Sequence, residues 1–187
     1  MLISAVIISV SLQATPAQPA ATALPPKPFD CTAPEYRQFD FWIGDWDVRL
    51  TNPPPPAAAA PAAPRKPATN LIQRAHHGCV VIENWDDGIG GTGQSSNLYD
   101  RVSQQWHQTW VDSNGGLHKY WGGLKNGSMV LVGEVPLPPT ARVQGRRTLR
   151  VTFIPMGADK MRQFSESLNS DGTWSANYDL TYTRRAK

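Results

Sequence analysis

The feature that most constrains the fold is a series of short apolar and aromatic segments, separated by turn residues, that runs from Thr69 to the end of the chain. Three of the separators, Asn114-Gly115-Gly116, Asn126-Gly127 and Asp171-Gly172, accept a positive φ and favour tight hairpins. No amphipathic helix of ordinary length interrupts the series. With one earlier segment, the pattern predicts an all-β antiparallel meander with strands at 44–51, 69–76, 79–86, 94–101, 105–112, 117–122, 128–135, 147–155, 161–169 and 173–183.

About ten strands in sequential hairpins have edges that must be covered, and closure into an up-and-down barrel removes those edges directly. A two-sheet sandwich is the alternative, but its Greek-key crossings need longer connections than a meander provides. A barrel of about ten strands is wide enough to leave an interior cavity. The predicted fold therefore makes binding of a small molecule the first functional hypothesis.

The N-terminal segment is typical of an export signal. An apolar run from Leu2 to Leu12 precedes small residues and prolines, and Ala21-Thr22-Ala23 offers a cleavage site. The run is shorter than the roughly 20 residues that span a bilayer, although a retained anchor stays open because a positive n-region is missing. We expect a signal peptide at 1–23, a disordered tail at 24–34 and a barrel domain at 35–187. The protein would be periplasmic or secreted, without membrane attachment after cleavage.

A proline- and alanine-rich stretch at 52–68 interrupts the barrel domain. Proline removes backbone donors and fixes φ, so neither a strand ladder nor a helix can continue through this stretch. It is predicted to be an extended or mobile loop. A tolerated surface insertion is the favoured interpretation, and a flap or docking arm is the alternative.

The chain has two cysteines, Cys31 and Cys79, and a formal net charge of +3. In an oxidising compartment the two cysteines would form a disulfide; two unlinked thiols are the alternative. The sequence contains no C-x-x-C motif, so it gives no indication of a zinc site. The basic residues are scattered in small groups, whereas nucleic-acid binding requires a concentrated basic face, so no nucleic-acid partner is expected. Oligomeric state cannot be derived from these features.

The segment QQWHQTWVD supplies the first candidates for the cavity. On a strand, Trp106, Gln108 and Trp110 share one face. A glutamine between two tryptophans could hold a polar ligand atom between apolar walls. A tryptophan pair in the core, with the glutamine bonded to a neighbouring strand, is the alternative.

Glu83, Arg150 and Gln163 are further candidates. Glu83 lies in GCVVIENWD, where both strand faces are partly apolar, so it is either a cavity carboxylate or a surface charge. One arrangement places Arg150 and Gln163 in the same cavity as Gln108, where the arginine would need a carboxylate partner. Arg150 on the exterior of the sheet is an equally open alternative.

Signatures of catalysis and metal binding are weak. His76 and His77 point to opposite faces of a strand, whereas His107 and His118 lie on neighbouring strands and could approach one iron. No G-x-S-x-G or phosphate loop is present. We therefore expect no catalytic residue, metal or cofactor. Haem binding, and an enzyme that uses Glu83 or Glu166 as acid or base, remain alternatives.

Several segments together resemble a known family: CTAPEYRQFDFWIGDWDV, GCVVIENWDD, YDRVSQQWHQTWVD, GSMVLVGE and RQFSESLNSDGTWSANYDLTYTRR. Over residues 31–185 the chain resembles the exported DUF1579-like bacterial proteins, grouped with lipocalin-like calycin barrels. The resemblance implies a closed barrel whose end is sealed by Phe41, Trp42 and Trp46, with a small apolar molecule in its cavity. It also implies the haem alternative, because the related nitrobindins hold haem through a histidine. A structural or interaction role for a filled barrel remains open.

Overall fold

The computed structural model describes residues 31–52, 66–137 and 145–186. The predicted signal peptide at 1–23, most of the predicted tail at 24–34 and most of the proline- and alanine-rich stretch at 52–68 lie outside these residues.

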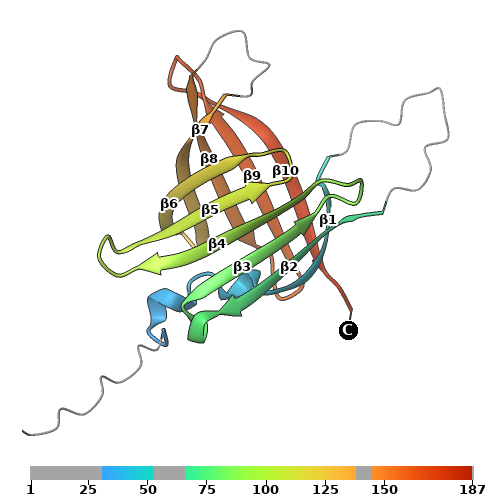
Figure 1. Cartoon of the computed structure of the whole chain (residues 1–187), viewed down its shortest axis with the longest axis vertical. Coiled ribbons are helices and arrows are strands. Elements are labelled where there is room, and N and C mark those ends of the chain that lie inside the picture. Colours follow the sequence, from blue (N-terminus) through green and yellow to red (C-terminus); the bar gives the residue numbers. More distant parts are fainter. Residues whose placement is uncertain (1–30, 53–65, 138–144, 187) are drawn as a thin grey trace, which may run out of the picture.

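Ten antiparallel strands form a closed barrel, so the predicted fold class is confirmed and the sandwich alternative is wrong (Figure 1). Each strand pairs with its neighbours along the chain, and β1 pairs with β10 to close the sheet. In chain order the strands are β1 (Gly44–Leu50), β2 (Ala68–Ala75), β3 (Val80–Asp86), β4 (Thr92–Asp100), β5 (Gln105–Asp112), β6 (Leu117–Lys125), β7 (Ser128–Pro136), β8 (Arg146–Pro155), β9 (Lys160–Leu168) and β10 (Trp174–Arg184).

The predicted strand bounds agree with these closely, and the largest difference is in β6. This strand continues through Gly122 and Gly123 to Lys125, three residues beyond its predicted end. Gly122 lies so close to β7 that a Cβ there would clash with the carbonyl oxygen of Val130. Glycine therefore permits a close approach of two strands here rather than ending one.

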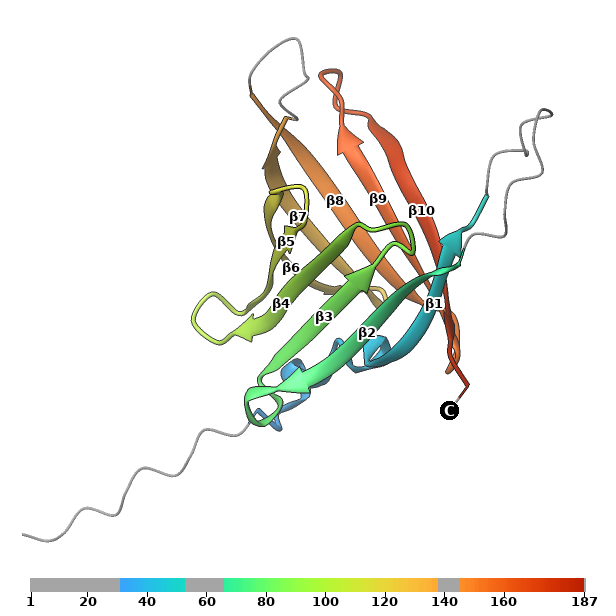
Figure 2. The ribbon, with the colours of Figure 1, turned by 45° about the vertical axis from the view of Figure 1, so that its right-hand side comes forward.

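The two ends of the barrel differ, and we call them the closed end and the open end. At the closed end lie the short 3-10 helices η1 (Pro34–Arg37), η2 (Asp40–Trp42) and η3 (His76–Gly78), together with the C-terminus (Figures 1 and 2). The meander brings the connections from β3 to β4, β5 to β6 and β9 to β10 to the open end. The Asn126-Gly127 hairpin lies at the closed end, with φ of 49° and 78°.

Aromatic side chains fill the closed end; we call this set the closed-end cluster. Phe39 stacks on Trp42 with ring centroids 4.7 Å apart, and its ring meets those of Trp106 and Phe153 edge-on at 5.5 and 5.0 Å. These rings and Trp46 are completely or almost completely buried. Edge-to-face and offset contacts of this kind add to the stabilisation from apolar burial.

The segment before β1 packs its aromatic side chains into this end of the barrel. Trp42 and Trp46 are inside, Phe41 is partly buried against the core, and Phe39 joins them although it was not among the predicted residues. Gly44, at φ 148°, turns the chain into β1, and a Cβ there would clash with the Arg184 guanidinium.

The three aspartates of the same segment face basic groups outside the core. Asp40 pairs with Arg74, while Asp45 and Asp47 both lie within 3.4 Å of the Arg185 guanidinium. Acidic and aromatic residues therefore alternate in this segment because the aromatic side chains fill the barrel and the aspartates form ion pairs at its outer edge.

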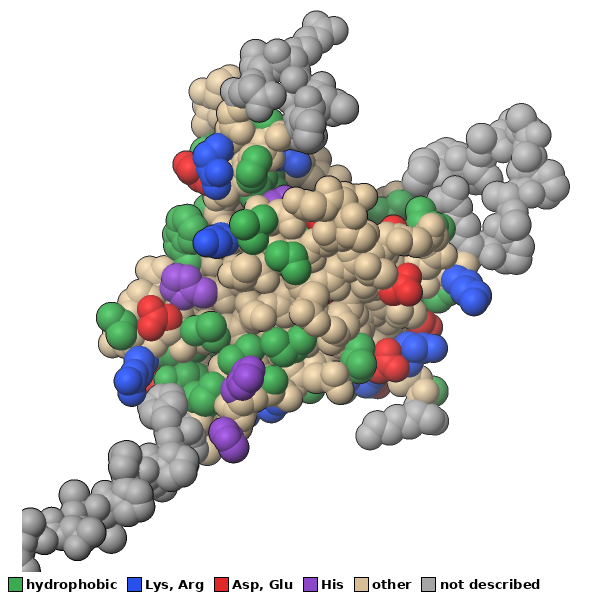
Figure 3. Space-filling model, viewed as in Figure 1, with side chains coloured by type: hydrophobic (Ala, Val, Ile, Leu, Met, Phe, Trp, Pro, Cys, Tyr) green, Lys and Arg blue, Asp and Glu red, His purple; other side chains and the backbone are tan. Residues whose placement is uncertain are grey.

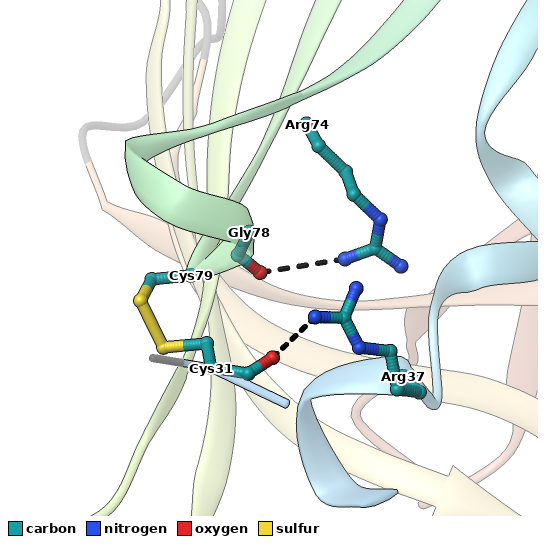
Figure 4. Close-up of a disulfide and its surroundings, with 5 residues drawn as sticks. All are labelled: Cys31, Arg37, Arg74, Gly78 and Cys79. Carbon is teal, nitrogen blue, oxygen red and sulfur yellow. Dashed lines mark hydrogen bonds between the residues drawn. A yellow bond between two sulfur atoms is a disulfide. The ribbon is translucent and has the colours of Figure 1, made fainter. Parts of the chain in front are cut away.

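The predicted disulfide between Cys31 and Cys79 is confirmed, with a Cα–Cα distance of 4.8 Å across a sequence separation of 48 residues (Figure 4). It ties the chain before η1 to the residue that follows η3. Arg37 donates a hydrogen bond to the carbonyl oxygen of Cys31, and Arg74 donates one to that of Gly78 at 3.3 Å. The disulfide and the ion pair between Arg74 and Asp40 thus fasten the N-terminal segment across the closed end.

Apolar, charged and other side chains are interspersed on the outer face in view in Figure 3. Exposed apolar side chains on the strands include Leu98, Val111 and Trp121. Within the three described ranges, no helix has the length and apolar character needed to cross a bilayer.

Candidate ligand-binding cavity

A cavity of about 410 Å³ occupies the half of the barrel toward the open end. It exists because side chains alternate along each strand, so that the inward set of several strands lines one space. The lining residues are Glu83, Trp85, Gln108, Trp110, His118, Tyr120, Arg147, Leu149, Val151, Gln163, Ser165, Asn177, Tyr178, Leu180 and Tyr182.

Apolar and aromatic side chains form much of the cavity wall. Trp85 and Trp110 come from near the ends of β3 and β5, at the open end, while Leu149, Val151 and Leu180 come from β8 and β10. Large indole rings beside aliphatic groups provide an apolar surface for a small organic molecule.

A chain of hydrogen-bonded polar side chains runs from β5 through β2 to β9 and β10 at the floor of this cavity, and we call it the polar girdle. Five of its eight side chains line the cavity. Its position follows from register: on β5, Gln108 comes between Trp106 of the closed-end cluster and Trp110 of the cavity wall, and on β3, Glu83 follows buried Val81. Its members are Asn70, Glu83, Ser95, Asn97, Gln108, Gln163, Tyr178 and Tyr182.

One arc of the girdle spans β2 to β5. Asn70 Nδ2 donates to Glu83 Oε1 at 2.7 Å, and the Ser95 hydroxyl donates to Glu83 Oε2 at 2.6 Å. Asn97 Nδ2 donates to Ser95 Oγ at 2.8 Å, and Gln108 Nε2 donates to Asn97 Oδ1 at 2.9 Å. All five side chains are buried, so these bonds offset the cost of removing their polar atoms from water.

The second arc connects β2 to β9 and β10. Asn70 Nδ2 also donates to the Tyr182 hydroxyl at 3.2 Å, and that hydroxyl donates to Gln163 Oε1. Gln163 Nε2 donates in turn to the Tyr178 hydroxyl at 3.1 Å. Burial raises the pKa of Tyr178 and of Tyr182, and Glu83 contributes to both shifts. Both phenols therefore stay neutral at ordinary pH.

Glu83 is the acidic residue of the girdle and is only 4% exposed. Burial raises its pKa to about 7, and the hydrogen bonds from Ser95 and Asn70 oppose that rise. Its two described partners are neutral, and none of the ion pairs found between described residues includes it. Its carboxyl group therefore gains or loses a proton near neutral pH.

The part of the cavity wall that contains His118, Tyr120 and Arg147, from β6 and β8, is called the upper wall here. The Tyr120 hydroxyl lies 3.4 Å from His118 Nδ1. Burial lowers the pKa of His118, with an opposing effect from Asp112, and burial raises the pKa of Tyr120 to about 12. Arg147 is exposed and acts on both groups electrostatically. The upper part of the cavity thus has one exposed cation and a histidine that is mostly neutral at pH 7.

Of the predicted cavity residues, Glu83, Gln108, Trp110 and Gln163 all line this space. Trp106 points inward as well, but it lies below the girdle in the closed-end cluster, where its Nε1 donates to Gln38 Oε1 at 3.1 Å. The structure therefore divides the inward face of β5 between two environments.

Arg150 is the exception, because it lies on the outer face of β8 rather than in the cavity. Its Nη2 and Nε lie 2.7 and 2.8 Å from Glu166 Oε2, and its guanidinium stacks 4.1 Å from the centre of the Trp174 ring. Leu149 and Val151 on either side point inward. A partner for the charge was therefore available outside the barrel, and the arrangement with Arg150 inside is wrong.

Tyr178 is a cavity residue that the sequence did not indicate. Regular alternation would put it on the same face as Trp174, which lies outside against Arg150. A bulge between Ala176 and Tyr178 shifts the pairing with β9 and turns Tyr178 inward. Tyr182, Arg147 and the girdle amides Asn70 and Asn97 were also missed, since no motif distinguishes them from ordinary strand residues. His118 was considered only as a possible ligand of iron.

No group of three or more histidine, cysteine, aspartate or glutamate side chains with metal-binding geometry is present in the described parts of the chain. His76 and His77 are exposed in η3, with φ of 50° and 56°. His107 lies on the outer face, 3.1 Å from the Ser103 hydroxyl, whereas His118 faces the cavity. The alternative in which His107 and His118 approach one iron is therefore wrong, because the two side chains lie on opposite faces of the barrel wall.

Comparison with models of known families gave no match, and no curated protein matches the chain significantly.

Proposed function

We propose that the protein is an exported barrel that binds a small, largely apolar molecule in the cavity at its open end. The observation that carries this proposal is the cavity of about 410 Å³, with an apolar wall around Trp85 and Trp110 and a floor of convergent polar groups. Pockets that bind small organic molecules combine these features, because the wall provides burial and a few polar groups fix orientation. A filled structural barrel would leave no such space.

Two further parts of the proposal concern origin. The disulfide between Cys31 and Cys79 supports an oxidising, exported environment, together with the N-terminal sequence. A relationship to the DUF1579-like proteins is proposed on the quoted motifs and is compatible with the barrel fold.

The binding proposal is tested with N-phenyl-1-naphthylamine, a neutral probe whose emission rises in an apolar environment. Leu180→Trp adds an indole inside the cavity, and Leu71→Trp makes the same change on the outer face of β2. We expect saturable binding to the wild-type protein and to Leu71→Trp. Binding to Leu180→Trp should fall by about tenfold or more, because the space is filled.

Thermal unfolding shows whether both variants are folded. Equal binding to both variants would place the probe outside the cavity and overturn the proposal. A wild-type protein that binds neither the probe nor any component of a lipid extract, measured by native mass spectrometry, would favour a structural role.

A haem-binding barrel is a second candidate because His118 lines the cavity and its lowered pKa favours the neutral imidazole that ligates a metal. Haem bound there would supply an iron centre for gas binding or redox chemistry. Titration with haemin tests this candidate: a Soret shift that is lost in His118→Ala and kept in His107→Ala would support it. Unchanged spectra for both variants would exclude His118 as the ligand.

A further inference from the structure

Among the residues that the structure describes, no cation pairs with the carboxyl group on the floor of the cavity. Glu83 is almost completely buried, and its two described hydrogen bonds come from the neutral side chains of Asn70 and Ser95. Two partly buried acidic side chains on the outer face of the barrel, Glu166 and Asp179, each pair with an arginine. Asp87 and Asp112, which are also partly buried, instead accept hydrogen bonds from backbone N–H groups. A buried carboxylate without a counterion is costly, so Glu83 is either protonated or paired with something that the barrel does not supply.

The neighbouring polar groups add further unused acceptor capacity. Gln108 Nε2 donates hydrogen bonds to Asn97 Oδ1 at 2.9 Å and to Ser95 Oγ at 3.4 Å. Its Oε1 accepts no hydrogen bond from the described residues. Each Glu83 oxygen accepts one bond and can accept another. The floor formed by Glu83 and Gln108 therefore suits a group that donates several hydrogen bonds.

Aromatic side chains line the cavity around Glu83 and Gln108, some of them as members of the girdle and others above it. Trp85 and Trp110 lie toward the open end, and Tyr120, Tyr178 and Tyr182 lie along β6 and β10. The faces of such rings attract organic cations, most strongly where water is excluded. An anion is disfavoured by the face of an aromatic ring and by an ionised carboxyl group.

We propose that the bound molecule is an organic amine, with its protonated nitrogen paired to Glu83 and donating to Gln108 Oε1, and its apolar body between Trp85 and Trp110. This inference rests on the proposed function and specifies the chemical class of the ligand. Arg147, the cation of the upper wall, is exposed at the far end of the cavity. Solvent and salt therefore screen its repulsion of the amine.

Isothermal titration calorimetry at pH 8 with three probes of one size tests the proposal: 2-phenylethylamine, 2-phenylethanol and phenylacetate. The amine should bind the wild-type protein about tenfold or more tightly than the alcohol, since hydrogen bonds to a charged group are stronger than neutral ones. Phenylacetate should bind most weakly. This comparison uses only the wild-type protein, so it holds even if a variant fails to fold.

Two matched variants identify the carboxyl group responsible. Glu83→Gln keeps the shape of the side chain and removes its charge, so the amine should lose its advantage over the alcohol. Glu166→Gln makes the same change on the outer face, where Glu166 pairs with Arg150, and should leave all three affinities unchanged.

The pH dependence provides a separate readout. Between pH 8 and pH 5 the amine stays protonated while Glu83 becomes neutral, so amine affinity should fall and alcohol affinity should not. The other titratable groups facing this space are Tyr178 and Tyr182 from β10, His118 and Tyr120 from β6 and Arg147 from β8. His118 gains charge at low pH and would weaken amine binding too, but that effect persists in Glu83→Gln.

Equal wild-type affinities for amine and alcohol would overturn the amine inference and leave the proposed function intact. An amine preference that survives in Glu83→Gln would also overturn it, because the cation would then bind elsewhere. If all three probes and the neutral naphthylamine probe fail to bind, the proposed function fails and the inference fails with it.

Discussion

The closed and open ends of the barrel are built from the same strands and the same inward faces, yet one is solid and the other hollow. Strand β5 shows the contrast within five residues: Trp106 is 1% exposed among Phe39 and Tyr99, whereas Trp110 lines the cavity. Gln108, between them, belongs to the polar girdle. The difference arises because η1 and η2 add aromatic rings at one end only.

This comparison leads to the hypothesis that the closed end stabilises the fold and the open end binds the ligand. Apolar burial at the closed end provides stability that the open end does not, since the open end leaves space unfilled and buries polar groups. Binding sites in general sacrifice stability for function. The predictions below test whether stability and binding can be changed separately at the two ends.

The largest expected effect is on stability at the closed end. Trp106→Ala should lower the free energy of unfolding by about 3–5 kcal/mol, because it leaves a cavity in a close-packed cluster. Trp110→Ala, on the same face of the same strand, should cost about 1 kcal/mol and weaken binding of the naphthylamine probe. Urea unfolding and probe titration measure both quantities. Equal losses of stability would show that the two ends are not energetically distinct.

Removal of the disulfide should have the next largest effect. The double variant Cys31→Ser/Cys79→Ser should be less stable by about 2–4 kcal/mol, since the unfolded chain gains freedom over a separation of 48 residues. Because the bond lies at the closed end, probe affinity of the folded protein should not change. Chemical denaturation with and without reductant measures the difference. A loss of probe binding while the protein remains folded would show that the two ends are coupled.

The pH dependence of stability should reveal Glu83 at the open end. Its pKa is raised from 4.5 to about 7 in the folded protein, so the folded state holds the proton more tightly than the unfolded chain. The free energy of unfolding should therefore fall as pH rises from about 4.5 to 7, by on the order of 2–3 kcal/mol from this group.

Glu83→Gln isolates that contribution. The Ser95 hydroxyl, which now donates to Glu83, can turn to accept from the new amide. Because the pKa of His118 is lowered, its contribution makes the free energy of unfolding rise with pH over part of this range. This contribution is present in both the wild-type protein and Glu83→Gln. The difference between variant and wild type should thus be small at pH 5 and favour the variant at pH 8. A difference that is independent of pH would refute the buried, titrating carboxyl group.

The smallest effect is expected on the outer face. Arg150 and Glu166 pair there with partial exposure of the arginine. Glu166→Gln should change the free energy of unfolding by no more than about 1 kcal/mol, with probe affinity unchanged. Denaturation at low and high salt measures it. A change in probe affinity would mean that the outer face influences the cavity.

Most of the fold could be predicted from the sequence because hairpin turns and alternating strands leave local signals. The turn at Asn126-Gly127 and the strand that contains Trp106 and Trp110 are examples, since each depends on only a few adjacent residues. Barrel closure followed from the need to cover the edges of a long meander.

The site was harder to predict because it depends on contacts between distant strands. Both faces of β3 are partly apolar, so the inward position of Glu83 becomes visible only with its bonds to Asn70 and Ser95. The bulge that turns Tyr178 inward has no sequence signature. The sequence left Arg150 as a possible cavity residue because it does not reveal that Glu166 is its partner. That partnership becomes visible only when β8 pairs with β9.

The indole N–H signals in a ¹⁵N–¹H correlation spectrum test the central claim most directly, because the seven tryptophans sample every environment of the barrel. Titration with 2-phenylethylamine should shift the signals of Trp85 and Trp110 and leave those of Trp42, Trp46 and Trp106 in place. The outer-face signals of Trp121 and Trp174 should also stay unchanged. Shifts confined to the outer-face signals, or to the closed-end cluster, would contradict a binding cavity at the open end.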